Sequence, residues 1–281
     1  MTPLTDAAPG YASLAVHFDL TPAAHDRGRL AVDLADRFGA HIVGLAAEQM
    51  LLPIYGDLGG PHVAATIAED EQGRVEEELA GAYAAFKTVV GARNNVEWRQ
   101  ALEEPSRHVI ANARAVDLIV LGRRSSKDAV DVALGVAPGA VTLECGRPVL
   151  ITPPGIDRLS ARSIVIAWKD TREARRAVRD ALPLLLRAEQ VVVVTSCGSF
   201  RDESAEDVAA FLARHGVNSR PEVRAGEISS IADEIIDAAD EIGADLIVAG
   251  AYGHSRTREW MFGGVTRSLL EISPVPLLLS H

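Results

Sequence analysis

Glycines, hydroxyl residues and cations gather in one segment near the end of the chain, GAYGHSRTREWMFGGVT at residues 250–266. Glycine carries no Cβ and therefore lets a ligand approach the main chain closely. Free N–H groups at the start of a helix, together with the positive end of its dipole, bind anions. The pattern is typical of a phosphate-binding loop, and glycine-rich turns also share it. The candidate binding residues in this segment are Gly250, Gly253, His254, Gly263, Gly264, Val265 and Thr266.

A second group of candidates ends an apolar run earlier in the chain, SIVIAWKD at residues 163–170. If this run and ADLIVAG at 244–250 are neighbouring parallel strands, their carboxyl ends flank the point where the strand order reverses. Ligands of open α/β sheets bind at that point. The candidates are Ala167, Trp168, whose ring could stack on a base or pack in the core, and Lys169, whose ammonium could attract a phosphate.

The elements that must position these residues occur twice. SLAVHFDLTPAA at 13–24 aligns with SIVIAWKDTREA at 163–174, an offset of 150 residues. VDLIVLGRRS at 116–125 aligns with ADLIVAGAYG at 244–253, an offset of 128. The order of elements is therefore shared, and the first copy is longer by 22 residues.

This duplication predicts two domains, at residues 1–152 and 162–281, joined by the Pro- and Gly-containing linker 153–161. We place the extra residues of the first copy near 48–72. Each copy alternates short, almost uniformly apolar runs with longer amphipathic stretches, as expected for strands that helices cover on both faces. The predicted fold class is α/β, with two tandem Rossmann-like doubly wound domains, each a five-stranded parallel sheet flanked by helices.

Composition and charge exclude several classes of protein. The net charge of −11, from 28 basic and 39 acidic residues, repels nucleic acid and anionic membranes. No apolar run approaches the roughly 20 residues that cross a bilayer, and the N-terminal segment has no secretory signal pattern. With only two cysteines, we expect a reduced protein of the cytoplasm.

Several catalytic patterns are absent from the sequence. It contains neither a G-x4-G-K-[ST] loop nor a G-x-S-x-G elbow. His17 has no partner at metal-ligand spacing. We therefore expect no catalytic residues and no metal site, and slow ATP hydrolysis would be the most activity that the sequence allows.

The spacing G-x2-G-x9-G at Gly250, Gly253 and Gly263 resembles the nucleotide-binding signature of the universal stress protein family, and the two copies resemble its tandem type. This resemblance implies five parallel strands in the order 3-2-1-4-5 and an adenine nucleotide, ATP or AMP, with or without Mg²⁺ and with no covalent cofactor. It also implies a regulatory role in the stress response. In addition, it implies an internal pseudo-dimer in which the terminal strands at 147–152 and 275–280 pair, and it leaves a homodimer of whole chains open.

Departures from the family pattern fall in both copies. Gly264 stands where relatives carry Ser or Thr, and Lys169 stands where they carry an Asp that binds adenosine; the first copy keeps this Asp as Asp19. The first-copy loop at 122–140 loses glycines and gains a proline. We therefore expect at most one nucleotide site, in the second domain. The alternative is an interaction module whose two sites have both decayed.

Overall fold

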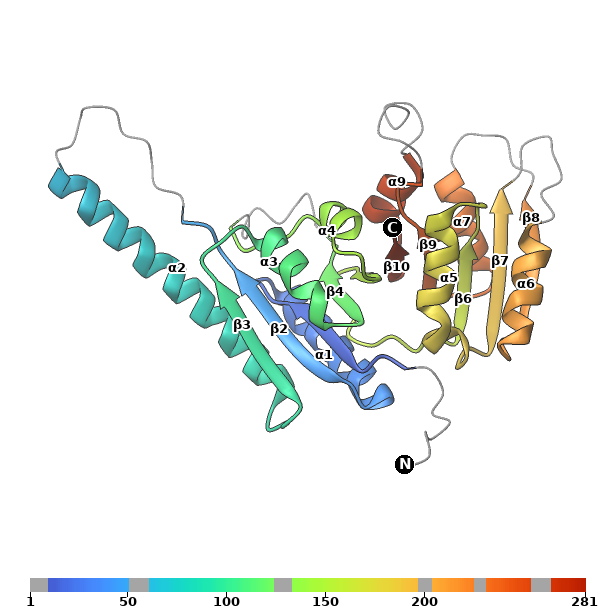
Figure 1. The fold of residues 1–281 in the computed structure, drawn as a ribbon, viewed down its shortest axis with the longest axis horizontal. Coiled ribbons are helices and arrows are strands. Elements are labelled where there is room, and N and C mark those ends of the chain that lie inside the picture. The colour runs from blue at the N-terminus through green and yellow to red at the C-terminus, as the bar shows by residue number, and fades with distance from the viewer. Residues whose placement is uncertain (1–9, 51–60, 124–132, 197–203, 225–230, 254–263) are drawn as a thin grey trace.

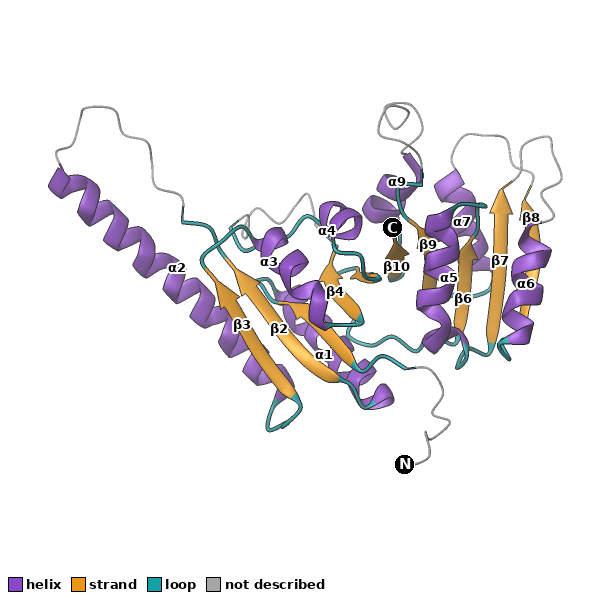
Figure 2. Cartoon of the chain, in the orientation of Figure 1, coloured by secondary structure: helices purple, strands orange, loops and turns teal. Residues whose placement is uncertain are grey.

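The computed structural model describes residues 10–50, 61–123, 133–196, 204–224, 231–253 and 264–281. Within them, ten strands form one sheet with helices on both faces (Figures 1 and 2). The strand order is β3-β2-β1-β4-β5-β10-β9-β6-β7-β8, and every pair is parallel except β5 with β10.

Each half of this sheet has the order 3-2-1-4-5, as predicted. The first-half strands are β1 (Ser13–His17), β2 (His41–Ala47), β3 (Val96–Ala101), β4 (Leu118–Gly122) and β5 (Val149–Thr152). The second-half strands are β6 (Ser163–Ala167), β7 (Gln190–Ser196), β8 (Ser219–Arg224), β9 (Leu246–Gly250) and β10 (Leu277–Ser280).

The terminal strands of the two halves pair with each other, as the resemblance implied. Leu278 lies opposite Leu150 in the antiparallel register, so the two five-stranded sheets become one. The side chains of both residues are fully buried. Burying a leucine side chain contributes roughly 1.5–3 kcal/mol to stability, so the junction is an integral part of the core. The domain bounds at 152 and 162 stay a prediction.

The core consists of two layers, one on each face of the sheet. Alternate residues of each strand enter different layers because successive side chains point to opposite faces. In β6, for example, Ile164 and Ile166 join one apolar cluster and Val165 joins the other. Both clusters run through both halves of the chain, which explains why the central strands are apolar on both faces.

Helices connect the strands as the amphipathic pattern predicted. Those of the first half are α1 (Pro22–Phe38), α2 (Pro61–Val90), α3 (Pro105–Asn112), the short 3-10 turn η1 (Ala113–Ala115) and α4 (Pro138–Glu144). Those of the second half are α5 (Arg172–Leu185), α6 (Ser204–Arg214), α7 (Ile231–Glu241) and α9 (Gly264–Ile272).

Much of the extra length of the first copy lies in α2. This helix has 30 residues, whereas α6, its counterpart, has 11. Its C-terminal half packs on the sheet, and its N-terminal half extends beyond the body of the molecule (Figure 1). The buried side chains recur at helical spacing: Val75, Leu79, Ala82, Phe86 and Val90. Residues 51–60 of the predicted insertion lie outside the described residues.

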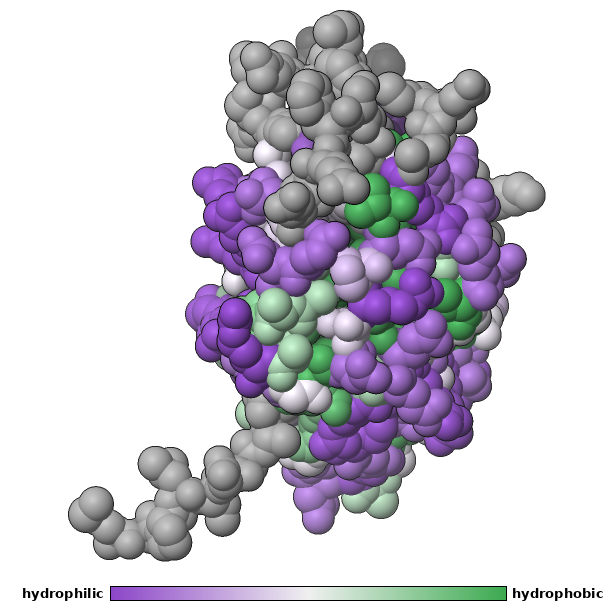
Figure 3. All heavy atoms as spheres, turned by 90° about the vertical axis from the view of Figure 1, so that its right-hand side faces the viewer, coloured by the Kyte–Doolittle hydropathy of each residue, from purple (hydrophilic) through white to green (hydrophobic). Residues whose placement is uncertain are grey.

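The two outer strands carry charged residues that discourage further strand pairing. In β8, Arg224 binds Glu222 at 2.7 Å and also pairs with Glu241 of α7, and Pro221 lacks a backbone donor. The end of the molecule that carries β8 and α6 is mostly hydrophilic (Figure 3). No helix in the described ranges combines the length and apolar character needed to cross a membrane.

The antiparallel register of β5 and β10 predicts a specific disulfide. In a background with Cys145 and Cys197 replaced by Ser, Leu150→Cys with Leu278→Cys should cross-link under mild oxidation. Directly opposed residues of antiparallel strands have Cα atoms about 4.5–5.5 Å apart, within the range for a disulfide. Mass spectrometry of a tryptic digest would identify the linked peptides.

The matched control combines Leu150→Cys with Leu279→Cys, whose side chains point to opposite faces of the sheet. This pair should remain reduced. Equal cross-linking of both pairs would contradict the register.

Candidate functional site

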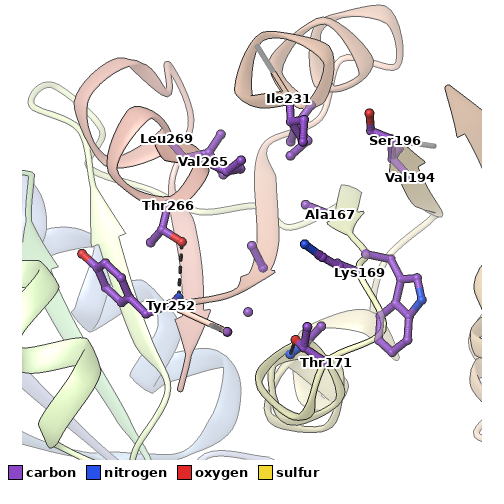
Figure 4. A pocket seen from close by; sticks show the side chains of 16 residues that line it. Ala167, Lys169, Thr171, Val194, Ser196, Ile231, Tyr252, Val265, Thr266 and Leu269 are labelled. Atoms are coloured by element: carbon purple, nitrogen blue, oxygen red, sulfur yellow. Dashed lines mark hydrogen bonds between the residues drawn. The ribbon is translucent and has the colours of Figure 1, made fainter. Parts of the chain in front are cut away.

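A pocket of about 470 Å³ opens at the carboxyl ends of β6 and β9 (Figure 4). Ala167 and Ala249 pair in register at these ends. In the sheet β6 lies between β7 and β9. The strand that follows β6 in the sequence, β7, is on one side of it, and the later strand β9 is on the other. The pocket therefore lies where the strand order reverses. This is the position at which open α/β sheets bind ligands.

The structure brings together most of the residues that the sequence marks as nucleotide-binding. Gly264 begins α9 as expected, but it is exposed and is not among the lining residues. His254 and Gly263 lie outside the described residues. The predicted residues that line the pocket are Ala167, Trp168, Lys169, Gly250, Gly253, Val265 and Thr266.

Gly250 lines the pocket, and the packing of a helix against the strand end requires a glycine there. A Cβ at this position would lie 2.7 Å from the carbonyl carbon of Glu173, 2.9 Å from the Cα of Ala174, and closer still to the Ala174 nitrogen. These are backbone atoms of the first turn of α5. The missing side chain therefore lets a helix pack against the strand end, and the close approach of a phosphate stays a prediction.

Gly253 faces a buried carboxylate. A Cβ there would lie 3.0 Å from Glu173 Oε2, and Glu173 is only 2% exposed. Burial alone would raise the pKa of Glu173, but hydrogen bonds from Arg172, from the backbone and from Thr171 leave that pKa below its usual value. An ionised carboxylate thus lies behind the glycine, and it is not itself part of the pocket wall.

The hydroxyl of Thr266 holds the first turn of α9 to the end of β9. The backbone N–H of Tyr252 donates to Thr266 Oγ1 at 3.4 Å, and Figure 4 shows this contact at the edge of the pocket. A hydroxyl that accepts one hydrogen bond keeps its own proton to donate. Thr266 can therefore still bind an acceptor on a ligand.

Tyr252 joins the pocket to the first half of the chain. Its φ of 55° is in the left-handed region, which costs a non-glycine residue roughly 1–2 kcal/mol. Figure 4 shows its ring directed out of the pocket. The Tyr252 hydroxyl packs against Gly139 of α4, and a Cβ added at Gly139 would lie 2.5 Å from the hydroxyl oxygen.

Trp168 packs in the core. The sequence had offered this role and stacking on a base as its two alternatives. It is 7% exposed and is a member of one of the two core clusters. Its indole Nε1 donates to Ser204 Oγ at 2.9 Å. The ring therefore supports the pocket wall from behind, and stacking on a base would require it to leave these contacts.

Residues that the sequence did not single out complete the pocket. Thr171, which lines it, also caps α5 by accepting from Ala174 N at 3.2 Å. Val194 and Ser196 end β7, and the carboxyl end of this neighbouring strand was a signal that could have identified them. Ile231 and Ile235 come from α7 and Leu269 comes from α9. They line the pocket because of the way these helices pack on the sheet. The full set is Thr171, Ala174, Val194, Ser196, Ile231, Ile235, Ala249, Tyr252 and Leu269.

The equivalent place in the first half is filled by its own side chain. Arg27 of α1, only 2% exposed, packs directly against Gly122 at the end of β4. Its guanidinium binds Asp19 at 3.0 Å, and Thr21 donates to the same carboxylate from its backbone N–H and its hydroxyl. Burial would raise the pKa of Asp19, but Arg27 and these hydrogen bonds hold it below its usual value. Asp19, the counterpart of Lys169 in the first copy, is therefore occupied by contacts within the protein.

His17 lies behind this ion pair. Its Nε2 donates to the carbonyl of Leu134 at 2.9 Å. Burial, together with the nearby guanidinium of Arg27, lowers the pKa of His17 to about 4. The ring is therefore neutral at pH 7. Among the described residues no group of three or more His, Cys, Asp or Glu side chains could hold a metal ion.

The second half of the chain matches the model of one protein family. Residues 160–281 match the model of the universal stress protein family. No curated protein matches the chain.

Solved structures resemble the whole chain. A universal stress protein from Archaeoglobus fulgidus is 16% identical with a TM-score of 0.69, and the match covers 95% of each chain. A putative universal stress protein from Pseudomonas aeruginosa is 19% identical with a TM-score of 0.57, covering 96% of this chain and 93% of that one. A functionally unknown protein from the same species is 17% identical with a TM-score of 0.56, covering 96% and 92%. At these identities the likeness establishes the fold.

The contact between Gly250 and α5 predicts a large loss of stability for Gly250→Ala. The new methyl group would meet helix backbone that cannot move without displacing α5, and such overpacking costs about 1–3 kcal/mol. Gly264→Ala is the matched control because a Cβ there meets no described atom within 4 Å. Its free energy of unfolding should change by less than about 0.5 kcal/mol. Urea unfolding measures both, and equal losses would refute the packing role.

The buried His17 predicts that stability falls in mild acid. Between pH 6.5 and about 4 the unfolded chain takes up a proton that folded His17 does not. The stabilisation is therefore complete above pH 6.5 and is lost as the pH falls toward 4, in total roughly 3 kcal/mol. Urea unfolding from pH 7 to 4.5 should show this slope, and His17→Asn should flatten it. A variant with an unchanged slope would contradict the assignment.

Proposed function

Because residues 160–281 belong to the universal stress protein family, we propose that the pocket at β6 and β9 binds an adenine nucleotide, ATP or AMP. The observation that carries this proposal is that one cavity gathers seven residues which the sequence marks as nucleotide-binding. Its volume of about 470 Å³ falls in the range of roughly 300–1,000 Å³ that small-molecule sites occupy.

The walls of the pocket suit the two parts of a nucleotide. Ile231 and Ile235 of α7, Val194 of β7 and Leu269 of α9 supply apolar surface for a base. Hydroxyl groups of other lining residues supply donors for phosphate oxygens. We place the phosphates beside Thr266, where the first turn of α9 offers N–H groups and the positive end of its dipole.

The proposal is of binding and regulation, and not of rapid turnover. The described lining residues include no carboxylate or imidazole that could act as a general base. A nucleotide held without hydrolysis can act as a signal, since its occupancy follows its concentration. We therefore propose that the chain is a stress-response regulator that senses an adenine nucleotide.

The first half favours a different role. Arg27 fills the position beside Gly122 and pairs with Asp19, which supports the interpretation that this site has decayed. Its long helix α2 extends beyond the sheet (Figure 1), and such an extension suits contact with another protein. The alternative in which the whole chain is an interaction module would also require the second pocket to be unable to bind nucleotide.

Titration calorimetry of the full chain with ATP and with AMP tests the proposal. We expect Ile231→Trp to weaken binding by about tenfold or more, because the larger indole would fill the mouth of the pocket. Ile272→Trp is the matched control. Both isoleucines are exposed on helices, 38% and 49% respectively, but Ile272 does not line the pocket.

The same purified protein, denatured and analysed by mass spectrometry, should release bound adenine nucleotide. Failure of the wild-type chain to bind or release any nucleotide would favour the interaction-module alternative. Equal affinity of the two tryptophan variants would place the nucleotide elsewhere.

A further inference from the structure

The side chain of Lys169 enters the pocket from the end of β6. It follows the central strand of the second half by two residues, and it lines the pocket. Figure 4 shows Lys169 directed inward, on the opposite side of the pocket from Thr266. The lysine and Thr266 therefore meet different ends of an occupant.

Lys169 is also the one ionised side chain among the described residues that line the pocket. The carboxylates that neighbour it in the sequence are bound to arginines and are not part of the lining. Asp170 pairs with Arg175 at 2.6 Å, and Glu173 pairs with Arg172. Although the chain has a net charge of −11, Lys169 brings to the pocket wall an ammonium group with three N–H donors.

The chemistry of an ammonium group restricts what it can recognise. A free ribose diol is recognised best by a carboxylate, which accepts both hydroxyl protons, whereas an ammonium group only donates. In dinucleotide-binding folds the same distinction separates a ribose with free hydroxyls, bound by an acidic residue, from a ribose 2′-phosphate, bound by a cation. An ionised acceptor paired with Lys169 would form a charge-assisted hydrogen bond.

Resting on the proposed function, which places the 5′-phosphates beside Thr266, we infer that Lys169 selects a nucleotide whose ribose carries a further phosphate ester on its 2′ or 3′ oxygen. The nucleoside end then lies at the end of β6, where the lysine meets the added phosphate. An ordinary 5′-nucleotide presents no anion there, so it binds the same pocket more weakly.

Three isomers of equal composition test this inference: adenosine 5′-diphosphate, adenosine 3′,5′-bisphosphate and adenosine 2′,5′-bisphosphate. They differ only in where the second phosphate is attached. Titration calorimetry with the full chain should show one bisphosphate binding about tenfold or more tightly than the diphosphate, the value expected for one charge-assisted hydrogen bond.

Variants at position 169 then assign the preference to the lysine. Lys169→Met should remove the preference while changing the affinity for the 5′-diphosphate by less than about threefold, and Lys169→Asp should reverse it. Arg267→Met is the matched control. Arg267 follows Thr266, is exposed, binds Glu271 at 2.8 Å and does not line the pocket, so its removal should leave the preference intact.

Equal affinities for the three isomers in the wild-type chain, or an equal loss for all three in Lys169→Met, would overturn the inference and leave the proposed function standing. In that case the lysine would meet the 5′-phosphates. No binding of any isomer, of AMP or of ATP would overturn the proposed function, and the inference with it.

Discussion

The close approach of the first turn of α5 to Gly250 determines the shape of the site. Helix backbone lies where a side chain of the strand would otherwise project, and this brings Thr171 and Ala174 into the wall of the pocket. The same turn places the buried Glu173 behind Gly253. Gly250, one of the glycines that suggested a ligand loop, is therefore required by the packing of a helix on the strand end, and Gly253 lies close to side chains of the same turn. The pocket is what this packing leaves open beside them.

The two halves differ in what lies against the glycine at the end of the fourth strand. Gly122 and Gly250 hold corresponding positions at the ends of β4 and β9. In the first half Arg27 reaches back from α1 to Gly122, while the residue 150 positions later in α5 is Ala177. A buried guanidinium must be fully hydrogen-bonded to be tolerated. Asp19 and the carbonyl of His17 accept two of its five N–H groups, at 3.0 and 2.6 Å.

Most of the fold could be predicted from the sequence because its signals are local. Uniformly apolar runs marked the strands, and the repeat marked their order in both halves. The length of α2 could not be predicted in the same way, since its N-terminal half extends beyond the sheet and residues 65–74 bury no regular apolar stripe. The pairing of β5 with β10 was implied by the family resemblance and not by any pattern of residues, and its antiparallel direction was not predicted.

The site was predictable only in part, because topology places the residues at strand ends but not those that helix packing brings to the pocket. Residues that end strands, such as Ala167 and Gly250, can be placed from topology alone. Ile231 and Ile235 enter the pocket because of the angle at which α7 packs, which no spacing in the sequence encodes. Arg27 has the sequence context of a solvent-facing helical residue, and its burial depends on Asp19 being in reach. Glycine spacing pointed to a segment that borders the pocket, but it did not show that the packing of α5 also requires a glycine at position 250.

Tyr252 gives the two halves of the chain a mechanical link. Its main chain holds α9 through Thr266, and its phenol rests against a glycine of α4 with no space to spare. A residue held in a left-handed conformation has few neighbouring wells to relax into. One residue therefore contacts both halves of the chain: its backbone N–H binds Thr266 at the pocket, and its hydroxyl lies against Gly139 of the first half.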